Sequence, residues 1–160
     1  MGRLVLFPTV EFAILFARPA VTVMALGIND GVPIGGVTCC GPAWSTAYAA
    51  RARSVMRTYA RGAQGRVLWL TLPVPRDPRF AEIARAVNLG LREAAADQDR
   101  VTLIPLDVLL TPGDRYRDAM QLGGRSVRVR AADGIHLSVA GARYVAAVVV
   151  ATLQRFRATG

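Results

Sequence analysis

Lysine is absent from this sequence, so all 20 basic residues are arginines, set against 11 acidic residues at a formal net charge of +9. A basic excess of this kind is typical of nucleic-acid binders. Arginine without lysine, with abundant alanine, glycine and valine, is also typical of GC-biased coding, which we take as the main cause. The charges are dispersed, and the helical spacing of Arg53, Arg57 and Arg61 indicates a solvated helix face. We therefore expect no nucleic-acid partner.

Cysteine and histidine are scarce, since the chain has two cysteines, Cys39 and Cys40, and one histidine, His136. Neighbouring cysteines bond each other only with strain, so we expect a free, partly buried thiol pair and no disulfide framework. A zinc site needs three or four nitrogen or sulfur ligands. The sequence thus implies neither a metal nor an organic cofactor, and it leaves the compartment open.

Long hydrophobic runs are missing as well. The best candidate, Leu4 to Ala17, has 14 residues and contains Pro8 and Glu11, whereas a spanning helix needs about 20 apolar residues. With Arg3 before it, the run could be mistaken for a signal-peptide core, but no small-x-small cleavage site follows. A second apolar run, near the C-terminus, is too short for a membrane and predicts a helix packed on a core. We therefore expect neither a membrane span nor a signal peptide.

The remaining composition predicts one globular domain, because 160 residues with 52% apolar residues can bury a core. Short apolar runs that predict buried strands alternate with amphipathic stretches that predict helices. The expected strands are Arg3–Phe7, Val21–Leu26, Arg66–Leu72 and Val101–Leu106. The expected helices are a short one from Thr9 to Ala17, Ala43–Arg61, Pro78–Ala96, and a last one capped by Ser138 that ends near Phe156. This alternation predicts a three-layer α/β/α sandwich with a mostly parallel sheet.

The first motif with chemical potential is Gly27-Ile28-Asn29-Asp30, directly after an expected strand, where ligands of parallel sheets bind. Gly27 permits a tight turn, and the Asn29 amide could donate a hydrogen bond to a developing oxyanion. For this tetrapeptide alone, an ordinary turn in which Asn and Asp bond their own backbone is the simpler explanation.

The second motif, Asp133-Gly134-Ile135-His136, holds the single histidine. Across a tight turn the Asp133 carboxylate can accept from Nδ1–H of His136, which fixes one tautomer and frees Nε2 as a general base. A loop histidine ahead of a helix cap is the competing interpretation.

Four further polar residues are weaker candidates. Asp107, directly after the expected strand Val101–Leu106, could face a site or cap a turn. Arg128 and Arg130 approach the second motif and could bind an anionic or acylated substrate, or could simply be exposed charges. Asp114 indicates a turn.

Together and in this order, G-x-N-D after an early strand and D-x-x-H before a C-terminal helix resemble the SGNH (GDSL-like) hydrolase superfamily. The surrounding sequence is similar to a bacterial subgroup carried as a domain of unknown function, the DUF459 type. The similarity covers roughly residues 18–157 of a single domain. It includes Trp44…Tyr48, Val67–Pro73, Asn88 and Val129–Ala142.

This resemblance implies a flavodoxin-like fold and a role for each motif. Asn29 would be an oxyanion-hole donor, and Asp133 and His136 would be the acid and base of a Ser-His-Asp triad. The resemblance also suggests that substrate lies near Gly27, Asp30 and Arg130.

The similarity fails at the front of the chain. The superfamily begins with a strand and a G-D-S block whose serine is the nucleophile, and a glycine in a second block adds an oxyanion donor; neither block is present. None of the four serines is placed like that nucleophile; they are Ser45, Ser54, Ser126 and Ser138. We therefore expect a domain incomplete at its N-terminus, because the chain is truncated or, alternatively, because it is a pseudo-enzyme.

The function implied by resemblance is ester hydrolysis or acyl transfer on a small-molecule or carbohydrate ester, for example an acylated cell-envelope carbohydrate, with a cell-envelope or secreted location. Without a serine nucleophile we expect little or no serine-esterase turnover. The rival interpretations are a non-catalytic binding domain on the same fold, an arginine-rich nucleic-acid binder, and hydrolysis by water activated by Asp133 and His136. Substrate identity and oligomeric state stay open.

Overall fold

The structure is a computed structural model that describes residues 19–60 and 65–158. The expected strand Arg3–Phe7 and the expected helix from Thr9 to Ala17 lie outside these residues. The strands are β1 (Val21–Met24), β2 (Arg66–Leu70), β3 (Val101–Ile104), β4 (Ala119–Leu122) and β5 (Arg125–Arg128). The helices are α2 (Pro42–Ala60), α3 (Pro78–Ala95), α4 (Leu106–Leu110), the short 3-10 helix η1 (Pro112–Asp114) and α5 (Val139–Ala158).

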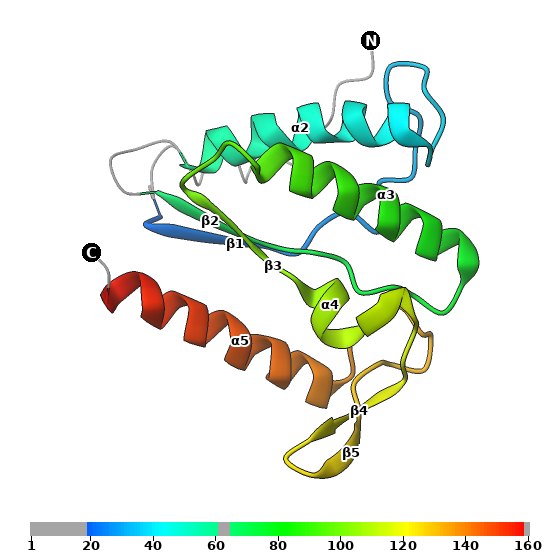
Figure 1. Cartoon of the computed structure of the whole chain (residues 1–160), viewed down its shortest axis with the longest axis vertical. Coiled ribbons are helices and arrows are strands. Elements are labelled where there is room, and N and C mark those ends of the chain that lie inside the picture. The colour runs from blue at the N-terminus through cyan, green and yellow to red at the C-terminus, as the bar shows by residue number, and fades with distance from the viewer. Residues whose placement is uncertain (1–18, 61–64, 159–160) are drawn as a thin grey trace.

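A parallel sheet of β1, β2 and β3, in that order, forms the middle layer (Figure 1). Val23 pairs with Leu68, and Leu68 pairs with Thr102. The chain order β1-α2-β2-α3-β3 supplies the helical crossover that each parallel neighbour requires. β4 and β5 form a separate antiparallel hairpin in which Gln121 pairs with Ser126.

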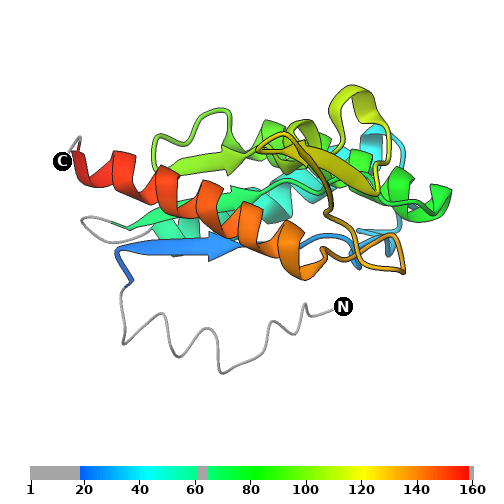
Figure 2. The ribbon, with the colours of Figure 1, turned by 90° about the horizontal axis from the view of Figure 1, so that it is seen from below.

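The alternation of side chains along β2 defines the two outer layers. Val67 and Trp69 lie in the core beneath α2 and α3, whereas Leu68 and Leu70 lie in the core shared with α4 and α5. Figure 1 shows α2 and α3 on one side of the sheet and α5 on the other, and Figure 2 shows α5 running along the strands from below. The predicted α/β sandwich with a parallel sheet is confirmed.

The helices agree well with the predicted ranges, but each parallel strand ends two residues before its predicted end. The observed ends are Met24, Leu70 and Ile104. After β2 the chain leaves the sheet because the side chain of Asn88 bonds both the N–H and the C=O of Leu72, each at 2.8 Å. After β3, Pro105 has no N–H for the ladder, and Leu106 begins α4.

The C-terminal helix α5 extends well beyond the short apolar run that was judged too short for a membrane. Its segment Val139–Phe156, with a mean hydropathy of 1.2, is long and apolar enough by length and composition to cross a membrane, so the expectation that it is too short was wrong. The packing prediction is confirmed, since Val145 is buried and Val149 and Leu153 pack against the core of Leu68 and Ile104.

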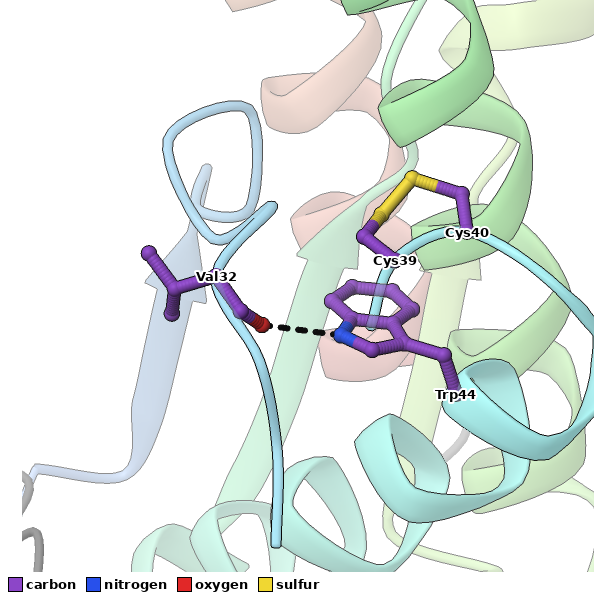
Figure 3. The surroundings of a disulfide bond; sticks show 4 residues. All are labelled: Val32, Cys39, Cys40 and Trp44. Carbon is purple, nitrogen blue, oxygen red and sulfur yellow. Dashed lines mark hydrogen bonds between the residues drawn. A yellow bond between two sulfur atoms is a disulfide. The ribbon is translucent and has the colours of Figure 1, made fainter. Parts of the chain in front are cut away.

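Cys39 and Cys40 are joined in a disulfide, so the predicted free thiol pair was wrong. The prediction rested on the strain expected of a bond between neighbouring cysteines, and the two Cα atoms lie 3.1 Å apart. The pair precedes α2 and packs, partly buried, against the core that contains Trp44. Figure 3 shows it with Trp44, whose Nε1 donates to the Val32 carbonyl at 2.9 Å.

The contact between α2 and α3 depends on the missing side chain of Gly90. A Cβ placed on Gly90 would lie 2.8 Å from the carbonyl oxygen of Ser45 and 3.2 Å from the amide nitrogen of Ala49. Both are backbone atoms of α2, so a side chain here would separate the helices.

We expect Gly90→Ala to lower the free energy of unfolding by about 1–3 kcal/mol, as overpacking does. Helix propensity alone predicts the opposite sign, a gain of about 1 kcal/mol. Urea unfolding measures the difference, and Leu89→Ala, at an exposed position next to Gly90, is the control. A stabilised Gly90→Ala variant would show that the helices are not in close contact there.

The disulfide predicts a thiol count. Ellman's reagent should detect no thiol in unfolded, unreduced protein and both thiols after reduction. Because the bond joins adjacent residues, chain entropy limits its contribution to about 1 kcal/mol, so the Cys39→Ser/Cys40→Ser variant should lose no more than that. Two thiols before reduction would restore the prediction made from the sequence.

Candidate functional site

The D-x-x-H motif forms a closed turn between β5 and α5. Arg130 and Leu137 form a bridge at its base, and the amide of Ala131 donates to the carbonyl of His136 at 2.8 Å. At the tip, Gly134 has a φ of 73°, a conformation that favours glycine. The turn therefore has a defined shape, set by its own backbone.

Within this turn the carboxylate of Asp133 lies against the imidazole of His136. Nδ1 is 2.6 Å from Oδ2, while Oδ1 accepts from the backbone N–H groups of Ile135 at 2.8 Å and His136 at 2.9 Å. A carboxylate is only an acceptor, so a neutral imidazole donates from Nδ1 and keeps Nε2 unprotonated. The His136 side chain is 77% exposed, and Nε2 has no partner among the described residues.

These hydrogen bonds hold the pKa of Asp133 well below its usual range. The bond with His136 is the largest cause, followed by those from the amides of Ile135 and His136. Asp133 therefore stays ionised at neutral pH. The geometry expected of the Asp133–His136 pair is present, and its chemical role remains a prediction.

The G-x-N-D motif is a turn at the end of β1. The amide of Asp30 donates to the carbonyl of Gly27 at 2.9 Å, and Gly27 has a φ of 134°. Asn29 is exposed, and its side chain has no hydrogen-bond partner among the described residues. Its amide is thus available to a ligand, as an oxyanion donor must be.

The side chain of Asp30 bonds Tyr48, and not its own backbone as in the ordinary turn considered from the sequence. Its Oδ2 accepts from the hydroxyl of Tyr48 on α2 at 3.0 Å. Burial of the phenol and the nearby Asp30 carboxylate raise the pKa of Tyr48, so the hydroxyl stays protonated and keeps donating. The contact fixes the turn on α2.

Both turns lie at the end of the sheet where the parallel strands finish, as Figures 1 and 2 show. Each borders the segment that follows β2. A Cβ on Gly27 would lie 3.2 Å from Leu72, and the carbonyl of Gly134 accepts from the amide of Arg76 at 3.1 Å. Within residues 19–60 and 65–158, no hydrogen bond joins the two turns directly.

Arg128 and Arg130 have unequal surroundings. Arg128 is exposed and pairs with Asp118 at 3.3 Å. Arg130 is fully buried, so the alternative of an exposed charge was wrong for it. Its guanidinium faces backbone carbonyls of the turn and of the segment after β2.

Three residues beside the turn were not identified from the sequence. Arg76 donates to the hydroxyl of Tyr116 at 3.0 Å and to the carbonyl of Ala132 at 3.3 Å, and the Tyr116 hydroxyl donates to Asp118 at 2.8 Å. The Arg76 side chain is 53% exposed and lies against Gly134, since a Cβ on Gly134 would be 3.0 Å from its Nε. No local pattern in the sequence marks these residues, because they come from separate segments.

Asp107 and Asp114 have structural partners. Asp107 accepts from the Thr71 hydroxyl at 2.6 Å and pairs with Arg92. Partial burial acts to raise the pKa of Asp107, but the Thr71 and Arg92 hydrogen bonds outweigh it and the pKa is lowered. Asp114 ends the η1 turn, as expected, and pairs with Arg85 at 2.5 Å.

None of the four serines, all of which lie in the described part of the chain, follows a parallel strand. Ser45 and Ser54 are within α2, and Ser126 is in β5 where a loop was expected. Ser138 caps α5 as predicted, since its Oγ accepts from the amide of Gly141 at 3.0 Å.

Comparison with known protein families finds a match to this chain. A family model described as "Protein of unknown function (DUF459)" matches residues 9–152. No curated protein matches the chain.

The depressed pKa of Asp133 predicts a pH dependence of stability. A carboxyl whose pKa is lower in the folded state contributes stability above its unfolded pKa of about 4 and loses it as pH falls further. The difference in unfolding free energy between the wild type and Asp133→Asn should therefore be largest at pH 6 and shrink towards pH 2.5.

Urea unfolding at several pH values measures that difference. Asp97→Asn, which removes one exposed carboxylate, controls for surface charge. A difference that does not change with pH would contradict the hydrogen bonds to Asp133.

Proposed function

The chain belongs to the DUF459 family of proteins of unknown function, and we propose that it is an SGNH-type domain for ester hydrolysis or acyl transfer. The observation that supports this most is the 2.6 Å contact between Asp133 Oδ2 and His136 Nδ1, with the imidazole open to solvent. A histidine without an orienting partner would suit a general base less well. We further propose an ester substrate, such as an acylated cell-envelope carbohydrate, and a location in the cell envelope or outside the cell.

In the proposed reaction, Nε2 of His136 removes a proton from the attacking hydroxyl group. The ionised Asp133 keeps the other proton on Nδ1 and stabilises the imidazolium that forms. The Asn29 amide donates to the oxyanion of the tetrahedral intermediate. Gly27 and Asp30 shape the turn that presents this amide.

The attacking group is the open element of the proposal. No serine among the described residues follows a parallel strand, so we expect little or no turnover by a serine route. Water activated by His136 could attack directly, without the advantage of a covalent intermediate. A non-catalytic ester-binding domain on the same fold is the second candidate, and the placement of the serines supports it.

The nucleic-acid alternative is less well supported. A contiguous basic surface would need unpaired arginines, yet many described arginines have an aspartate partner. Those in ion pairs are Arg53, Arg76, Arg79, Arg85, Arg92 and Arg128.

We expect a short-chain p-nitrophenyl ester to bind at the two turns without being hydrolysed above the background rate. In NMR titrations, the His136 imidazole and the Asn29 side-chain amide should shift. Asn29→Ala and His136→Ala should each weaken binding by about 10-fold, the loss of roughly one hydrogen bond to the ligand, and Asp97→Asn should not.

Three outcomes would separate the candidates. Turnover that disappears in His136→Ala would overturn the expected inactivity and favour water attack. Ester binding that gives no turnover and shifts neither His136 nor Asn29 would favour the non-catalytic ester-binding domain on the same fold. No shift at either residue, together with DNA binding that weakens steeply with salt, would replace the proposal by the nucleic-acid alternative.

A further inference from the structure

Arg130 is one of the largest fully buried side chains of the described structure, with a relative exposure of 0%. A guanidinium is expensive to remove from water unless it gains hydrogen bonds and other favourable contacts. It also stays charged in proteins, even though burial lowers the pKa of Arg130. The contacts around Arg130 should therefore explain why this charged side chain is buried.

The partners of Arg130 come from two separate segments. Nη2 donates to the carbonyl of Val74 at 3.1 Å, which belongs to the segment after β2, and to the carbonyl of Gly134 at 3.3 Å. The carbonyl of Pro73 is at the limit of hydrogen bonding, at 3.5 Å. The guanidinium carbon lies 5.5 Å from the centre of the Tyr116 ring, a cation–π contact.

Gly134 is the residue through which this contact reaches the candidate site. It lies between Asp133 and His136, and its carbonyl accepts two hydrogen bonds, from Arg130 and from the amide of Arg76. The carboxylate of Asp133 meets the amides of Ile135 and His136 only if the peptide units around Gly134 keep this orientation.

We propose that Arg130 is a positioning residue that ties the Asp133–His136 turn to the segment after β2 through the carbonyls of Gly134 and Val74. Its hydrogen bonds go to backbone carbonyls and not to the imidazole of His136, so it acts through the orientation of the turn. The geometric part of this proposal stands apart from the proposed function, and only its catalytic meaning depends on that function.

The alternative is that Arg130 contributes only to overall stability. The two roles differ in which amides become exposed. Removing a positioning residue opens the turn locally, whereas removing a purely structural residue accelerates exchange throughout the chain in parallel. Leu68 in the central strand β2 reports the second case.

The test is hydrogen exchange of the Ile135 and His136 amides in Arg130→Met and Arg130→Lys, each compared with Leu68 in the same sample. We expect exchange of the two turn amides to rise at least about 10-fold relative to Leu68 in Arg130→Met. In this variant the turn can open without breaking the hydrogen bonds from Arg130 to the carbonyls of Gly134 and Val74. Arg130→Lys should show a smaller rise, since an ammonium can still donate to one of these carbonyls, although its side chain is one bond shorter than that of arginine.

A second readout is the Nδ1–H proton of His136, which the Asp133 carboxylate protects from exchange with water. Its downfield NMR signal should be visible in the wild type and in Arg125→Met, which removes an exposed arginine of β5. The signal should broaden or vanish in Arg130→Met.

Turn amides and an Nδ1–H signal that stay as in the wild type, or that change only in parallel with Leu68, would overturn the proposal. If Arg130→Met does not fold, Arg130→Lys decides by the same ratio. Neither readout uses ester turnover, so failure of the proposed function would leave this result interpretable.

Discussion

The two hydrogen bonds between the side chain of Asn88 and the backbone of Leu72 are the constraint on which the candidate site depends. Asn88 is buried, and its amide matches the N–H and the C=O of Leu72 at the point where β2 leaves the ladder. Buried backbone groups without partners are costly, so these bonds stabilise the departure from the sheet. The chain then continues through Val74 and Arg76, against which the Asp133–His136 turn lies.

The elements of the fold could be predicted because their signals are local. Pro78 and the apolar period after it place α3 to within a residue, and Ser138 marks the start of α5. Strand ends were less predictable, because Leu72 is as apolar as the residues before it while its backbone bonds belong to a helix distant in the sequence.

In the candidate site, too, contacts between residues close in the sequence were easier to predict than contacts between distant ones. Asp133 and His136 are three positions apart, so the motif offered their contact as one of two interpretations, and the structure has that contact. The partners that orient them could not, because Arg130 and Val74 are separated by 56 positions and meet only in the folded chain. Arginine is exposed in most proteins, so its burial beside Tyr116 has no signature in a single sequence.

Ser138 links the last helix to the turn in a way that affects motion. Its hydroxyl accepts from Gly141 in the first turn of α5 and donates to the carbonyl of Arg128 at 2.7 Å, while its amide donates to Val129 at 3.0 Å. Fraying of the helix start and release of the strand that leads into the turn therefore break shared bonds. We therefore expect the start of α5 and the segment leading into the turn to open together, which would tie the lifetime of the Asp133–His136 contact to the fraying rate of the helix.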